Sequence, residues 1–124
     1  MATILHITTR VEWDAARAAG SYRAPSLDVD GFIHCSTAAQ ATASASRYFR
    51  GRTDLVLLCI DEGRLAAEVR YEPPSAPLGA APDPRAAERL PHVYGPIDLD
   101  AVIRVLPFPC EPDGAFVLPA EAGS

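Results

Sequence analysis

With 124 residues, the chain is long enough to form one domain over 1–124 with a buried core that needs no disulfide bonds. Its net charge of −5, spread along the sequence, makes nucleic acid an unfavourable partner, because binding to phosphate backbones depends on clustered cations. The longest apolar run, 55–60, is too short to span a bilayer, so we expect no membrane association. The cysteines lack the paired spacing of a zinc site, so we expect a cytoplasmic protein without bound metal.

The first elements predicted are a strand over 3–7 and a helix that follows it. Thr9 and Glu12 form a capping-box pattern at the start of this helix, and Gly20 is placed to end it. The helical face expected to pack on the core carries Val11, Ala15, Ala18 and, at its edge, Trp13.

The next segment predicts a polar connection, a strand and a second helix. Residues 21–30 are mostly polar, and 32–35 form a short apolar run of strand length. A second capping box at Thr37 opens an alanine-rich helix that extends to about Phe49.

The later part of the core predicts strands alone, so the fold class is α+β with both helices in the first half. The continuous apolar run within 54–61 predicts a central strand covered on both faces, whereas 68–72 alternates like a half-exposed strand. A strand over 101–106 closes a core of about 3–107. The rest, 108–124, is expected to hold an edge strand at 115–118 and a frayed tail.

Between these strands, 73–91 is rich in proline, alanine and glycine. Six prolines in this stretch are unfavourable for a sheet, so a long surface loop is predicted, with one helical turn at 84–89. Such a loop beside a site is often a lid.

All three histidines lie in short apolar or aromatic segments, at His6, His34 and His92. Imidazole titrates near neutral pH, so three such residues favour a site, although a single buried histidine is as often a hydrogen-bonded core residue. Because the three share this setting, we expect them to border a common cleft. If so, replacing His34 or His92 by Ala should leave the fold nearly intact.

Other chemistries remain open from the residues alone. The three histidines with Cys35 supply enough ligands for zinc, and their spacing neither supports nor excludes it. His34 and Cys35 are neighbours on a strand and point to opposite faces, so they do not form a nucleophilic pair. Arg47 lies in an arginine cluster suited to phosphate, but a solvated helix end is the favoured explanation of that cluster.

Several motifs together resemble the bacterial domain-of-unknown-function family 952, over Ile4 to about Leu106. They are the segments 5–8, 20–22, 26–27, 31–36, 54–58 and 91–96, together with Trp13, Gln40 and Phe49. That family in turn resembles the ADP-ribosyltransferase fold, which implies a compact split β-sheet that clasps NAD in a cleft. In this resemblance, 4–8 is similar to the fold's first motif, whose histidine holds a ribose. The segment 31–36 is similar to its second motif.

The chain also departs from that fold. Ile7 stands where the first motif usually has glycine, and a histidine replaces the nicotinamide-stacking tyrosine of the second motif. The glutamate of many transferases has no counterpart near His92. The RNA 2′-phosphotransferase branch of the fold also lacks this glutamate and uses histidine and arginine.

The resemblance therefore implies binding of NAD or an ADP-ribose-like nucleotide, with NAD as substrate, and an ADP-ribosyl transfer, NAD-cleaving or 2′-phosphotransferase-like reaction. It assigns catalysis to His34 and His92, and nucleotide binding to His6, Tyr22, Arg23, Ser36, Arg47 and Tyr94. An RNA end is the one form of nucleic acid compatible with this assignment, and the protein acceptor is left open. The alternatives are a non-catalytic nucleotide-binding module and a histidine-based metal-dependent hydrolase.

Overall fold

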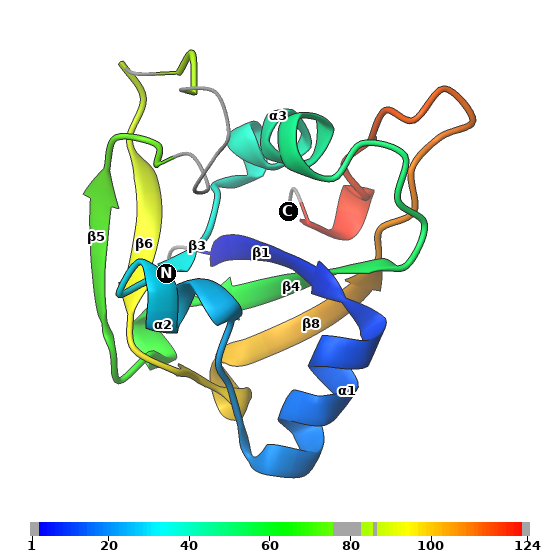
Figure 1. The fold of residues 1–124 in the computed structure, drawn as a ribbon. Helices are drawn as coiled ribbons and strands as arrows, with labels where there is room; N and C mark the ends of the chain where they lie inside the picture. The colour runs from blue at the N-terminus through cyan, green and yellow to red at the C-terminus, as the bar shows by residue number, and fades with distance from the viewer. Residues whose placement is uncertain (1–2, 76–82, 86, 123–124) are drawn as a thin grey trace.

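The computed structural model describes residues 3–75, 83–85 and 87–122. Within these ranges the chain forms two three-stranded antiparallel sheets, a two-stranded ribbon and three α-helices (Figure 1). This arrangement confirms the predicted α+β class. No helix in the same ranges is long and apolar enough to cross a membrane.

The first sheet places β4 (Leu55–Asp61) between β1 (Thr3–Thr9) and β8 (Val102–Pro107). Every residue of β4 is buried, which confirms the central strand predicted from its continuous apolar run. Alternate side chains of a strand point to opposite faces, so β4 contributes to two cores. One core contains Val56, Leu58 and Ile60, and the other contains Leu55, Leu57 and Cys59.

The second sheet has β6 (Leu90–Tyr94) between β3 (Ile33–His34) and β5 (Glu68–Glu72). A single antiparallel bridge between Leu5 and Ser36 joins the two sheets, and each of these residues donates its N–H to the other's carbonyl at 2.7 Å. The sheet is thus split, and the bridge holds β1 against the end of β3.

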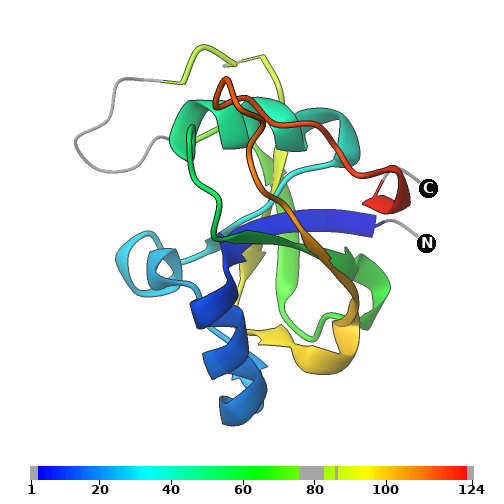
Figure 2. The ribbon, with the colours of Figure 1, turned by 90° about the vertical axis from the view of Figure 1, so that its right-hand side faces the viewer.

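Both longer helices begin at the predicted N-cap residues, with the full capping box at Thr37 and, at Thr9, only its threonine half. At the start of α1 (Arg10–Ala19) the Thr9 hydroxyl accepts the Glu12 N–H at 3.1 Å. Gly20 ends this helix with a φ of 94°, in the left-handed region that favours glycine. The second long helix, α3 (Ala38–Tyr48), lies on the other side of the first sheet from α1 (Figure 2).

The buried face of α1 differs from the prediction. Val11 is 78% exposed, and Ala15 and Ala18 are exposed as well, whereas Trp13 and Ala16 are buried. The helix is rotated because burying the indole of Trp13 removes far more apolar surface from water than burying a valine and two alanines.

Residues 21–30 are more ordered than the predicted polar connection. Ser21–Tyr22 forms β2, which pairs with β7 (Ile97–Asp98), and Pro25–Val29 forms the short helix α2. The prediction was wrong because Tyr22, only 2% exposed, anchors this segment in the core and Pro25 suits the first turn of a helix.

The described parts of the predicted proline-rich loop contain no helix or strand; they are residues 73–75, 83–85 and 87–89. The rest of that prediction, including part of the expected helical turn, falls on 76–82 and 86, outside the described residues. The predicted end of the loop was wrong, because Leu90 and Pro91 belong to β6. Pro91 has no N–H to donate, but its carbonyl accepts the Cys35 N–H at 3.0 Å.

The C-terminal segment covers the second core without forming the edge strand predicted at 115–118. Phe116 is buried, with its ring centroid 5.0 Å from that of Phe108. Packing of this aromatic pair, rather than pairing with a sheet, therefore decides the path of the segment. The last two residues, in the predicted frayed tail, lie outside the described part of the chain.

Candidate functional site

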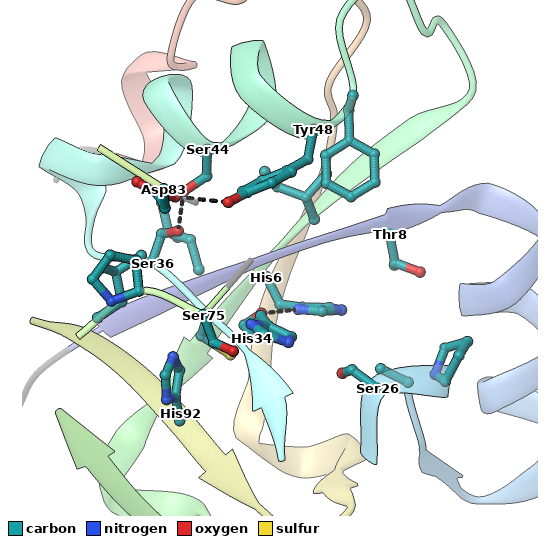
Figure 3. Close-up of a pocket in the computed structure, with 18 of the residues that line it drawn as sticks. His6, Thr8, Ser26, His34, Ser36, Ser44, Tyr48, Ser75, Asp83 and His92 are labelled. Atoms are coloured by element: carbon teal, nitrogen blue, oxygen red, sulfur yellow. Dashed lines mark hydrogen bonds between the residues drawn. The ribbon is translucent and has the colours of Figure 1, made fainter. Parts of the chain in front are cut away.

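A cavity of about 300 Å³ lies between the two sheets, α2, α3 and the described ends of the proline-rich loop (Figure 3). His6, His34 and His92 all line it. Cavities of this size are typical of small-molecule sites. The structure therefore gathers side chains that are distant in sequence around a space that suits a ligand.

Strand pairing explains how the histidines meet. His34 and His92 are direct cross-strand partners in the β3–β6 pair, and their ring centroids are 5.5 Å apart. The bridge between the sheets holds β1 beside β3, so that His6 Nδ1 lies 2.6 Å from the His34 carbonyl oxygen. The three rings thus come from three strands that the split sheet brings together.

Both ring nitrogens of His6 are engaged within the protein. A carbonyl oxygen only accepts, so Nδ1 carries the proton donated to His34. Burial lowers the pKa of His6 to about 4, so the ring is neutral and Nε2 accepts the Tyr22 hydroxyl proton at 2.8 Å. That hydroxyl also lies 3.1 Å from Thr8 Oγ1. His6 therefore has a structural role in the lining of the cavity. Neither of its ring nitrogens is free to hold a ribose hydroxyl or a metal in this conformation.

His92 is oriented by its neighbours, and one of its ring nitrogens has no hydrogen-bond partner among the described residues. Its Nδ1 lies 2.9 Å from Glu72 Oε1, which also accepts the Tyr94 hydroxyl at 2.6 Å. The ring stacks on Phe32 with centroids 4.1 Å apart and an angle of 17°. Burial lowers the pKa of His92 although Glu72 opposes this shift, so the ring is neutral at pH 7. Nδ1 donates to the carboxylate, and Nε2 is an acceptor with no hydrogen bond to any described residue.

His34 is the most accessible of the three histidines. Its side chain is 34% exposed, and Nε2 pairs with Asp30 Oδ2 at 3.0 Å. Asp30 directly follows α2, so this contact fastens the end of α2 to β3. Replacing His34 would remove a contact at the rim of the cavity and little of the core.

Opposite β6, the ion pair of Asp83 and Arg85 reaches the cavity from the proline-rich loop, and Tyr48 joins it from α3. Arg85 Nε and Nη2 contact the Asp83 carboxylate at 3.0 and 2.8 Å, and Tyr48 donates to the same carboxylate at 2.7 Å. The Asp83 side chain is only 1% exposed. Its hydrogen bonds, of which those from Arg85 have the largest effect, hold the pKa of Asp83 far below the usual range. The remaining Arg85 nitrogen, Nη1, donates to Ser44 Oγ at 3.0 Å.

The other residues predicted for the site divide into two groups. Tyr22 and Ser36 line the cavity with the histidines. Arg23 lies outside and forms an exposed pair with Asp28. Arg47 also lies outside, 3.8 Å from the Asp83 carboxylate. Tyr94 reaches the site through Glu72 and through Phe32, whose ring stacks on His92.

Sequence reasoning missed Glu72 and Arg85. Glu72 is 20 residues from His92 in the chain and meets it only because β5 pairs with β6. The alternation of 68–72 was a signal for a strand but not for its partner. Arg85 lies in the proline-rich loop, where neither periodicity nor a motif distinguishes it.

Known proteins resemble this chain over most of its length. Residues 7–105 match the family described as "Protein of unknown function (DUF952)". The crystal structure of protein CC0527 from Caulobacter crescentus is 34% identical, with a TM-score of 0.77 and 94% of each chain covered. Its solution NMR structure is also 34% identical, with a TM-score of 0.73, covering 93% of this chain and 91% of that chain. No curated protein matches at a significant level.

Proposed function

We propose that this chain, which belongs to the DUF952 family of proteins of unknown function, binds a nucleotide of the NAD or ADP-ribose type in its histidine-lined cavity. The observation that carries the proposal is the meeting of three histidines and one arginine from separate segments on one cavity of small-molecule size. With His6 in the cavity wall, His34, His92 and Arg85 are the members of this set that would offer hydrogen-bonding groups to phosphate and ribose.

Within this proposal, His92 is the residue that contacts the ribose. Its ring lines the cavity, its Nε2 is an acceptor without a hydrogen bond to the described residues, and the carboxylate on Nδ1 increases the basicity of the ring. A ribose hydroxyl that donates to this nitrogen would be held and polarised by the hydrogen bond. His34 would contact the nicotinamide side, as the resemblance to the transferase fold implies, and its 34% exposed side chain at the rim supports this role.

Nucleotide binding is tested by thermal unfolding of the purified protein with NAD, ADP-ribose, a 2′-phosphorylated RNA end or divalent metal ions. A ligand at 100 times its Kd stabilises the folded state by about 2.7 kcal/mol, so the Tm should rise by several degrees with NAD or ADP-ribose. Stabilisation by metal ions alone would favour the hydrolase alternative. An unchanged Tm with every compound would refute the nucleotide proposal.

The pair formed by His92 and Glu72 favours catalysis as a second candidate function. In NAD cleavage, the bond between ribose and nicotinamide breaks and its electron pair leaves with nicotinamide. The acceptor oxygen bonds to the ribose carbon, and its proton passes to His92 Nε2. Glu72 is then a positioning residue, because it acts on the reaction through His92 and fixes which ring nitrogen carries the proton.

Glu72→Gln should lower the rate of nicotinamide release from NAD by about tenfold, in the range typical when such an orienting partner is replaced. Without the carboxylate the pKa of His92 falls further, so the acid limb of the pH–rate profile should move to lower pH. Glu68→Gln is the matched control, because Glu68 lies on the same strand and pairs with the exposed Arg70 instead. Identical profiles for the two variants would exclude this role for Glu72.

A further inference from the structure

We propose that Arg85, Ser44 and Ser36 form a phosphate-recognition subsite on the α3 side of the cavity. The inference rests on the proposed nucleotide-binding function and assigns the phosphate end of the ligand. We refer to these three residues as the donor chain.

The donor chain is a continuous series of hydrogen bonds that ends at the cavity. Arg85 Nη1 donates to Ser44 Oγ at 3.0 Å, and Ser44 Oγ lies 3.1 Å from Ser36 Oγ. Either hydroxyl can donate in the contact between the two serines, and the proposal takes the direction in which Ser44 accepts from the guanidinium and donates to Ser36. The Ser36 hydrogen then remains for a ligand. Each bond polarises the next, so Ser36 becomes a stronger donor than an isolated hydroxyl.

Arg85 is held in place before any ligand binds. Asp83 engages its Nε and Nη2, which leaves the Nη1 edge of the guanidinium toward Ser44 and the cavity. The Asp83 carboxylate is 1% exposed and is shared with Tyr48 and the Arg47 guanidinium, so it presents little negative charge to a ligand. A guanidinium fixed in this way loses little conformational entropy when it binds an anion.

The opposite side of the cavity has the complementary chemistry. Figure 3 shows Ser44 on the α3 side and His92 on the β6 side of the space between them. The neutral His92 offers an acceptor, whereas the donor chain offers polar hydrogens. A ligand with a phosphate at one end and a hydroxyl at the other satisfies both sides, which is the pattern of a nucleotide's phosphate and ribose.

The test compares binding of ADP-ribose, adenosine and inorganic pyrophosphate by calorimetry. We expect pyrophosphate to compete with ADP-ribose, and Arg85→Met to weaken ADP-ribose about tenfold or more while the affinity for adenosine stays unchanged. Ser36→Ala, which preserves the contact between Arg85 and Asp83, should weaken ADP-ribose several-fold, and it provides a test if Arg85→Met fails to fold. Arg17→Met, on the exposed part of α1, removes the same charge outside the cavity and should have no effect.

The outcomes separate this inference from the proposed function. Unchanged ADP-ribose affinity in both Arg85→Met and Ser36→Ala would overturn the phosphate subsite and leave nucleotide binding intact. Binding of pyrophosphate that depends on Arg85, with no binding of ADP-ribose, NAD or adenosine, would support the subsite and overturn the proposed function. Absence of binding by every probe to the unmodified protein would overturn both.

Discussion

At pH 4 the protein should be about 3 kcal/mol less stable than at pH 7 through His6 alone. Burial lowers the pKa of His6 from 6.5 to about 4, whereas in the unfolded chain the ring titrates near 6.5. The unfolded state therefore binds more protons between these values. The stabilisation is fully present above pH 6.5 and is lost as the pH falls toward 4.

Urea unfolding at a series of pH values between 4 and 7.5 measures this loss. His6→Asn should be less stable at pH 7, because it loses the Tyr22 contact, but its stability should depend much less on pH over this range. A smaller dependence remains from His92, whose pKa is also lowered. Carboxylates with a lowered pKa, such as Asp83, also lose their contribution as the pH falls, but they are the same in both proteins and do not obscure the comparison.

The matched control is His34→Gln, which removes an accessible imidazole from the same cavity. It should retain the pH dependence of the unmodified protein. If His6→Asn and the unmodified protein lose stability equally between pH 7 and 4, the inference that His6 is buried in its neutral form is wrong.

Replacing His92 by Ala should lower the free energy of unfolding by about 2–4 kcal/mol, whereas His34→Ala should cost less than about 1 kcal/mol. His92 is 2% exposed, stacks on Phe32 and donates a hydrogen bond to the Glu72 carboxylate, so its removal leaves a cavity and takes a partner from Glu72. The His34 side chain is 34% exposed and loses one rim contact. The sequence-based expectation that both variants fold almost normally is therefore retained only for His34.

Urea unfolding gives the stabilities, and ADP-ribose binding to the folded variants gives the effect on the site. His92→Gln is the better binding variant, because the amide retains hydrogen-bonding groups and fills part of the space. Under the proposed function both His92 variants should bind ADP-ribose more weakly than the unmodified protein. Equal stability of the two alanine variants would contradict the different burial of the two rings.

Local patterns were sufficient for much of the fold. The capping boxes and Gly20 placed the ends of α1 because N-terminal donors and left-handed backbone are properties of a few adjacent residues. The run 55–60 identified a central strand because burial on both faces leaves no polar position in it. By contrast, the prediction of which face of α1 is buried was wrong, because the fit of Trp13 to the rest of the core depends on distant residues.

The candidate site shows the same division. Sequence alone singled out His6, His34 and His92, since their apolar settings are local, and predicted that they meet. Only the tertiary structure decided that His6 is locked between Tyr22 and the His34 carbonyl, that His92 is paired with Glu72, and that Arg85 reaches the cavity. These features depend on strand register and on where a loop docks. Contacts between segments far apart in the chain set both, and they leave no periodic signal in either segment.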